Sequence, residues 1–278
     1  MLGRKALLVG LLACPTMLTA QVRDTTHPPK PAPTPTTRRS ITITFTDFAF
    51  DAPDTVLAGV TTFHAINKGA EQHQATLVRL DSSKTVADLL AALRTPGPLP
   101  GWATLYGGPQ NASTVMMGLP PGNYAWICLM PGADGVMHFA KGMVRPLTVV
   151  AAKGIGAAPA PSAVVTATDY TWTISKPILA GRRVLRVVTS ANSQPHEVVI
   201  MRLAPGKTAQ DVLAWSAHPA GPPPAVSVEG VAALGPKMVN YAAIDFKRGH
   251  YLFICFFPDA KDGKTHAAHG MVKDVVVR

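Results

Sequence analysis

The chain has 278 residues, of which 47% are hydrophobic and 15% charged, so it is long enough for two domains and too apolar to be a wholly disordered protein. Its formal net charge is +10, which favours acidic partners or anionic membranes unless the charges are simply scattered over the surface. No run of basic residues is interleaved with aromatic residues, so we expect scattered charges and no nucleic-acid partner.

Residues 1–20 have the pattern of a signal peptide. Arg4 and Lys5 precede an apolar stretch, which ends at a small-residue cleavage site. The stretch that ends at Cys14 also resembles a bacterial lipobox, in which that cysteine would carry a lipid. No other apolar run suits a membrane helix, so we expect export to the periplasm or beyond, with no transmembrane segment in the mature chain.

Two segments of low complexity divide the rest of the chain. A stretch rich in proline and threonine follows the signal peptide, and an alanine, glycine and proline segment lies near the middle. The predicted order is a signal peptide (1–20), a tether (21–40), domain 1 (41–150), a linker (151–162) and domain 2 (163–278). We call the two domain segments the first and second repeat, because their sequences match.

The repeat is visible in several matched motifs, spaced roughly 125 residues apart, which indicates duplication of a whole domain. The matched pairs are Thr46-Asp47-Phe48 with Thr168-Asp169-Tyr170, Leu77-Val78-Arg79-Leu80 with Ile200-Met201-Arg202-Leu203, and Gly122-Asn123-Tyr124-Ala125-Trp126-Ile127-Cys128 with Gly249-His250-Tyr251-Leu252-Phe253-Ile254-Cys255.

Within each repeat, short apolar stretches between glycine, proline and asparagine turns predict β-strands. In the first repeat these strands are expected at residues 41–45, 60–66, 75–80, 124–128 and 143–150. Apolar residues fall at helical spacing only in 84–93 and its partner 207–215. The prediction is an all-β fold of two tandem Greek-key β-sandwiches, each with a short helical insertion.

Each repeat carries cysteine, histidine and methionine in the same order. In the first repeat nine residues separate Cys128 from His138 and four separate His138 from Met143; in the second repeat the spacings are ten and four. A histidine before an earlier apolar strand also matches between the repeats. The candidate ligands are therefore His73, Cys128, His138 and Met143 in one set and His196, Cys255, His266 and Met271 in the other.

A thiolate, two imidazoles and a weak thioether are a donor set that suits copper in both of its common oxidation states. Either methionine could instead fill core space, and each histidine could be an ordinary hydrogen-bonded one. Cys128 and Cys255 lie in different repeats, so we expect no disulfide between them.

These residues resemble the ligand pattern of the cupredoxin, or blue copper, family. The longer loop from cysteine to histidine is similar to that of copper-containing nitrite reductases and related multicopper proteins. The resemblance covers both repeats and implies up to two type 1-like copper ions. It also implies that the histidines and cysteines are equatorial ligands and that Met143 and Met271 are axial.

The sequence departs from the family's enzymes beside each cysteine, where their catalytic copper requires further histidines. The neighbours here are Ile127 and Leu129 in the first repeat, and Ile254 and Phe256 in the second. We therefore expect no second, substrate-binding copper centre and no enzyme activity. Histidines supplied across a subunit contact would reopen that possibility.

Four other histidines lack a counterpart in the opposite repeat. His269 aligns with Lys141, and we expect it to be exposed near the second site. His64, His218 and His250 are interpreted as surface or strand residues. Aromatic residues two and four positions before each cysteine should share its strand face and pack the core.

Three functions remain open from the sequence. The first is one-electron transfer through the copper sites, with an unidentified redox partner protein. The second is copper capture and delivery, and the third is a metal-free binding module with the cupredoxin fold. The sequence does not predict the oligomeric state.

Overall fold

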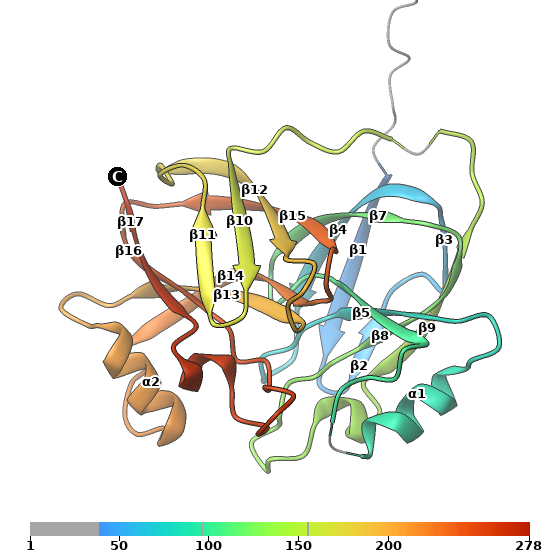
Figure 1. Cartoon of the computed structure of the whole chain (residues 1–278), viewed down its shortest axis with the longest axis horizontal. Coiled ribbons are helices and arrows are strands. Elements are labelled where there is room, and N and C mark those ends of the chain that lie inside the picture. Colours follow the sequence, from blue (N-terminus) through green and yellow to red (C-terminus); the bar gives the residue numbers. More distant parts are fainter. Residues whose placement is uncertain (1–38, 96, 155) are drawn as a thin grey trace, which may run out of the picture. The chain divides into compact units, whose positions relative to one another are not determined.

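The computed structural model describes residues 39–95, 97–154 and 156–278 (Figure 1). The predicted signal peptide and most of the tether lie outside the described residues, and Arg39 already belongs to the first strand. None of the helices in this part of the chain is long and apolar enough to cross a membrane.

The described chain is built mainly from strands, as predicted. The first repeat contains β1 (Arg39–Thr46), β2 (Ala49–Asp51), β3 (Thr55–Leu57), β4 (Gly59–Asn67), β5 (Thr76–Leu80), α1 (Val86–Leu93), β6 (Ala103–Gly107), β7 (Thr114–Leu119), β8 (Gly122–Ile127), the 3-10 helix η1 (His138–Lys141) and β9 (Val144–Val150). The second contains β10 (Ala163–Thr168), β11 (Thr171–Ile174), β12 (Gly181–Thr189), β13 (His196–Leu203), α2 (Ala209–Ala217), β14 (Ala225–Leu234), β15 (Val239–Phe246), β16 (Gly249–Ile254), the 3-10 helix η2 (His266–His269) and β17 (Val272–Val277).

Both predicted helical insertions are confirmed, and the same pattern of capping hydrogen bonds begins each helix. The Thr85 hydroxyl accepts a hydrogen bond from the main-chain N–H of Asp88, whose carboxylate accepts one from the N–H of Thr85. Thr208 and Asp211 make the same reciprocal pair at α2. Such a capping box satisfies main-chain donors that a helix start would otherwise leave unpaired.

The strands form two sheets, with order β11-β10-β12-β15-β7-β4-β1-β2 in one and β17-β16-β13-β14-β6-β5-β8-β9-β3 in the other. Each repeat contributes strands to both sheets, so the chain crosses from one sheet to the other within each repeat. Phe63 on β4 and Trp126 on β8 meet edge to face, with ring centroids 5.2 Å apart, which places the two sheets of the first repeat against one core. The predicted all-β sandwich class is confirmed.

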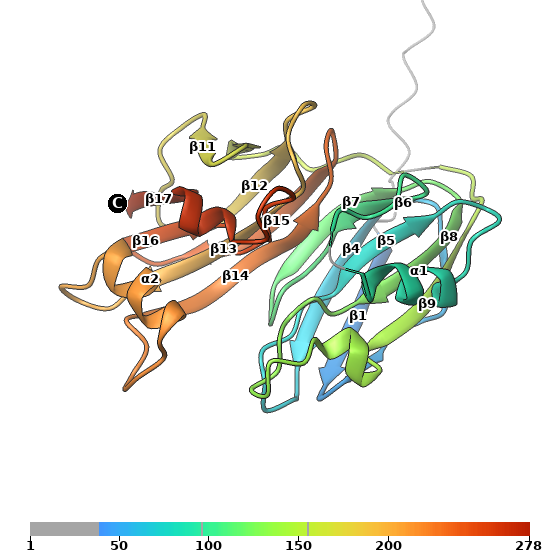
Figure 2. The same ribbon diagram turned by 60° about the horizontal axis from the view of Figure 1, so that its bottom comes forward.

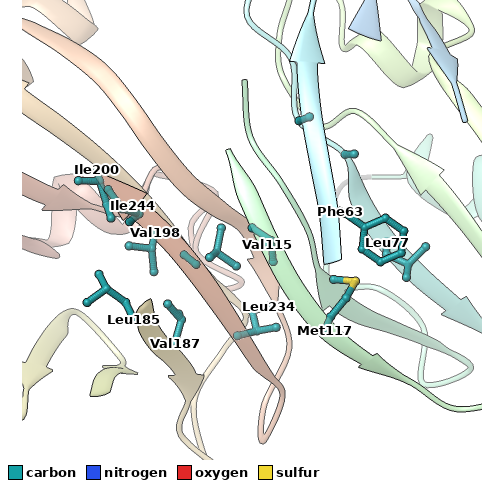
Figure 3. Packing of buried hydrophobic residues seen from close by; sticks show 14 of the residues in the cluster. Phe63, Leu77, Val115, Met117, Leu185, Val187, Val198, Ile200, Leu234 and Ile244 are labelled. Carbon is teal, nitrogen blue, oxygen red and sulfur yellow. The ribbon is translucent and has the colours of Figure 1, made fainter. Parts of the chain in front are cut away.

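Both sheets continue from one repeat into the other. In the first sheet β7 pairs with β15 in antiparallel register, from Asn240 opposite Met117 to Ala243 opposite Thr114. In the second sheet β14 meets β6 where Leu234 lies opposite Tyr106. Buried side chains of both repeats accordingly belong to one hydrophobic cluster, part of which is shown in Figure 3.

Alternation along β8 divides its side chains between two layers. Tyr124, Trp126 and Cys128 are fully buried in the main core, as predicted for residues two apart on a strand. Ala125 and Ile127 face the other way, into a cluster that includes Leu89 of α1. Helix α1 thus covers the outer face of the sheet at β5, β6 and β8 (Figure 2).

We expect Leu89→Ala to lower the free energy of unfolding by about 3 kcal/mol, because it leaves a cavity where α1 packs on the sheet. Leu57→Ala is the matched control, since Leu57 is 46% exposed and its truncation should cost less than about 1 kcal/mol. Urea unfolding of the metal-free proteins measures both values. Equal losses in the two variants would contradict the packing role of α1.

Candidate metal centre

Main-chain hydrogen bonds join the two ends of the loop that follows each cysteine. The N–H of Cys128 donates to the carbonyl oxygen of Met143 (3.2 Å), and the N–H of Met143 donates to that of His138 (2.9 Å). Gly142 permits this return, because it ends η1 with a φ of +103°, in a region that favours glycine. The second repeat does the same through Cys255, Met271, His266 and Gly270.

Glycine and aspartate residues shape the turns at the tips of these loops. Gly135 and Gly263 have φ values of +75° and +72°. The carboxylates of Asp134 and Asp262 each accept a main-chain N–H two residues further on, both at 3.0 Å. The loops therefore have a defined conformation, which fixes the histidine that follows each of them.

In the first repeat three predicted ligand atoms converge in the interior. Nδ1 of His73 lies 3.0 Å from Nδ1 of His138, which lies 3.4 Å from Sγ of Cys128. All three residues are at most 1% exposed. We call this group site 1.

The second repeat builds the same triangle. Nδ1 of His196 lies 3.0 Å from Nδ1 of His266, and Sγ of Cys255 lies 3.8 Å and 3.4 Å from these two nitrogens. These residues are also at most 1% exposed, and we call the group site 2. Both cysteines are free thiols, as predicted.

The triangles have the dimensions that one metal ion requires. Nitrogen and sulfur ligands at about 2.0 to 2.3 Å from one ion lie roughly 3.5 to 4 Å apart when they surround it in a plane. The observed separations of 3.0 to 3.8 Å need only small adjustments to reach that geometry. Two imidazoles and one thiolate also match the softness of copper, so the residues present fit the ion that the sequence predicts.

The outer nitrogen of the first histidine in each site is held by a carboxylate. Nε2 of His73 lies 3.0 Å from Oδ1 of Asp47, and Nε2 of His196 lies 3.0 Å from Oδ1 of Asp169. A carboxylate accepts hydrogen bonds and therefore keeps the imidazole proton on Nε2. Nδ1 is then left with a free lone pair that points into the triangle.

The second histidine differs between the sites. In site 1, Nε2 of His138 lies 2.9 Å from Oε2 of Glu71. In site 2 the position of Glu71 is occupied by Gln194, which donates to Asp259 (2.8 Å), and Asp259 lies 3.8 Å from Nε2 of His266. The carboxylate thus comes from a different loop in each repeat, and Nε2 of His266 has no direct hydrogen-bond partner among the described residues.

An aromatic residue covers each second histidine. Phe48 and Tyr170 have φ values of +67° and +62°, a conformation that is rare for bulky residues and that indicates a position fixed by its surroundings. The ring centroid of Phe48 lies 5.1 Å from that of His138, and the ring centroid of Tyr170 lies 5.7 Å from that of His266. This packing contributes to the complete burial of both imidazoles.

Burial determines the proton affinities of the ligands. It raises the pKa of Cys128 to about 11 against the opposing effect of main-chain hydrogen bonds from Gln74 and Met130, and it also raises the pKa of Cys255. Burial lowers the pKa of His73 and lowers that of His196 to about 4. Without metal, each site therefore holds a neutral thiol, and these two imidazoles are neutral; a metal ion must displace the thiol proton.

The methionines are placed beside these groups by the main chain. Met143 and Met271 are fully buried, and each is linked by main-chain hydrogen bonds to both the cysteine and the second histidine of its own site. Axial ligation by their sulfur atoms stays a prediction.

The other histidines of the described residues lie outside both triangles. His218 and His250 are exposed, and His64 is half-buried on β4 with a hydrogen bond to Thr114. His269 is exposed near site 2, as predicted, and pairs with Asp262 at 3.1 Å. With Asp259 these two form the third group of side chains among the described residues that lie close enough together to hold a metal ion.

Sequence reasoning missed the acidic partners of the histidines. Asp47 and Asp169 could have been found, because they occupy matching positions in the repeated Thr-Asp-aromatic motif. Glu71 and Asp259 do not match each other, so the repeat gave no signal for them.

No protein-family model and no curated protein matches the sequence. Among solved structures, a reduced auracyanin from Roseiflexus castenholzii is 28% identical and covers 40% of this chain and 96% of its own, with a TM-score of 0.27. A blue copper oxidase from Nitrosomonas europaea is 13% identical and covers 86% of both chains, with a TM-score of 0.23. A copper-containing nitrite reductase from Thermus scotoductus SA-01 is 12% identical over 87% of this chain and 62% of its own, with a TM-score of 0.22. All three TM-scores are low.

The lowered pKa of His196 predicts how the stability of the metal-free protein changes with pH. The folded state keeps this imidazole neutral down to about pH 4, whereas the unfolded state takes up a proton below about 6.5, so stability is lost as the pH falls through this range. Between pH 7 and 4.5 we expect His196 to account for about 2 kcal/mol of this loss.

Urea unfolding of the wild type and His196→Gln at both pH values tests this, with the exposed His250→Gln as the control. The comparison separates the contribution of His196 to stability from that of Glu197. Burial raises the pKa of Glu197 to about 7, so this residue stabilises the folded state as the pH falls. An identical pH dependence in the wild type and His196→Gln would contradict the assignment.

Proposed function

We propose that this chain is a copper protein of the cupredoxin type, which holds one copper ion at each of two buried sites and transfers single electrons. The observation that carries the proposal is the same triangle of two imidazole nitrogens and one cysteine sulfur, built twice from matching positions. A chance contact of a buried cysteine with two histidines would not be expected to recur in register.

The surroundings of each site suit one-electron chemistry. Bound copper would supply a one-electron couple, and the protein would hold its ligands in nearly the same place in both oxidation states. The main-chain N–H of Gln74 donates to the sulfur of Cys128 at 3.4 Å and stabilises its anionic form. Asp47 and Asp169 keep the histidine lone pairs directed inward, and the buried aromatic residues exclude water.

Complete burial favours electron transfer over copper delivery. A delivery protein must expose its ligands to the protein that receives the ion, whereas the six triangle residues are at most 1% exposed. An electron needs no such opening. Release of copper to an acceptor protein on mixing would favour the delivery role instead.

The cellular setting of the proposal rests on the sequence alone. The predicted signal peptide indicates a location outside the cytoplasm, where a redox partner protein would exchange electrons with one of the sites. The proposed role does not include a substrate reaction.

We expect the purified protein with Cu(II) to show an intense visible absorption band from the bond between sulfur and copper. Cys128→Ser and Cys255→Ser should each remove the contribution of one site, and the double variant should remove the band. Absorption spectra during a Cu(II) titration measure this, and circular dichroism confirms that each variant is folded. A folded wild-type protein with no such band would contradict the electron-transfer role and favour a metal-free module.

We expect Asp47→Asn to weaken Cu(II) binding at site 1 by about tenfold, because loss of a carboxylate behind a ligand histidine typically costs this much or more. In the Cys255→Ser background only site 1 contributes, so a competition titration reports this site alone. Asp51→Asn in the same background is the control, because Asp51 is an exposed residue of β2. Equal affinity in the two variants would show that Asp47 does not orient His73.

A further inference from the structure

A row of buried polar side chains runs between the two sites. Gln74, Gln110 and Glu197 are 3%, 5% and 6% exposed, although each carries a polar group that would ordinarily be in water. Burying such groups is costly unless they are hydrogen-bonded to each other. We call these three residues the polar bridge.

The two ends of the polar bridge contact the two cysteines. Gln74 follows His73, and its main-chain N–H donates to Sγ of Cys128 at 3.4 Å. Glu197 follows His196, and its carboxylate is held beside Cys255 by the main-chain N–H of Phe256. Gln74 and Glu197 therefore hold equivalent positions in the two repeats, one beside each sulfur.

Gln110 joins these ends across the boundary between the repeats. Its Nε2 group lies 3.3 Å from Oε1 of Gln74 and 3.3 Å from Oε2 of Glu197. A third acceptor, the carbonyl oxygen of Val231, also lies 3.3 Å away. The other oxygen of Glu197 accepts the N–H of Phe256 (3.2 Å), the residue next to Cys255.

The fold holds Gln110 in this position from several sides. Its main-chain N–H donates to the hydroxyl of Ser113 at 2.8 Å. Gly230 on β14 leaves space for its side chain, because a Cβ atom there would clash with Oε1 of Gln110 and with the carbonyl oxygen of Val198. An amide group has two N–H hydrogens, so Gln110 must divide them among three acceptors, and a shift of one partner changes its bonds to the others.

We propose that Gln110 is a positioning residue that couples the two metal sites through the polar bridge. Filling site 1 fixes Cys128 and the N–H of Gln74; the side chain of Gln74 then fixes Gln110, and Gln110 fixes Glu197 beside Cys255. Site 2 is thereby brought closer to its metal-bound geometry before it is filled, which lowers the cost of the small adjustment that the second ion requires. The coupling is reciprocal, so filling site 2 first favours site 1 by the same factor. This proposal rests on the proposed metal sites.

The test uses Cu(I), titrated into the full chain against a chromophoric Cu(I) chelator. Cys128→Ser gives the affinity of site 2 alone, and Cys255→Ser gives that of site 1 alone. In the wild type we expect the second ion to bind about fivefold tighter than to the same site alone, the lower end of the range for coupled sites. Gln110→Met fills the same space but cannot donate a hydrogen bond, so this factor should fall to about one.

Ser227→Ala is the matched control. It removes a different hydrogen bond between the repeats, from Asn111 at 3.4 Å, without contact to the polar bridge, and should keep the fivefold factor. A factor of one in the wild type, or a fivefold factor that persists in folded Gln110→Met, would overturn the coupling while leaving two independent copper sites. Absence of cysteine-dependent Cu(I) binding would instead overturn the proposed function.

The comparison of the wild type with the two cysteine variants does not need the Gln110 variant to fold. A second ion that binds the wild type no more tightly than the same site alone would by itself overturn the coupling.

Discussion

The cysteine sulfur directly after β8 and β16 is the constraint on which the rest of the structure depends. A thiol at this place, with two imidazole nitrogens beside it, is surrounded by the hydrophobic core and cannot use water to stabilise charge. The protein compensates with main-chain N–H groups directed at the sulfur and with carboxylates behind the histidines. The hairpin that carries Asp47, the loop that carries His73 and the return through Gly142 serve this arrangement.

The two sites are copies with different surroundings. Both have the same triangle and the same aspartate behind the first histidine, but the second histidine is paired directly with Glu71 in one site and lies further from Asp259 in the other. A negative group close to a ligand stabilises the more oxidised metal ion through simple electrostatics. The duplication therefore preserved the ligands and allowed their electrostatic environment to differ.

Much of this structure could be predicted from the sequence, and the reason is the repeat. Short apolar stretches between turn residues located the strands, and apolar residues at helical spacing located both helices. Matching positions identified the converging histidines and cysteines. What the sequence did not reveal depends on contacts between distant strands: Asp47 reaches His73 because β1 pairs with β4. Glu71 and Asp259 were not predicted because they do not occupy matching positions in the two repeats. Gln110 was not predicted because its hydrogen-bond partners come from both halves of the chain.

The continuation of both sheets across the repeats has a consequence for solubility. A strand at the edge of a sheet exposes unpaired N–H and carbonyl groups, which can recruit strands of other molecules and cause aggregation. In this chain β7 and β15 cover each other, as do β6 and β14 where they meet. In each sheet, each half thus covers one edge of the other, and a fragment cut within the linker would expose these strands as templates for self-association.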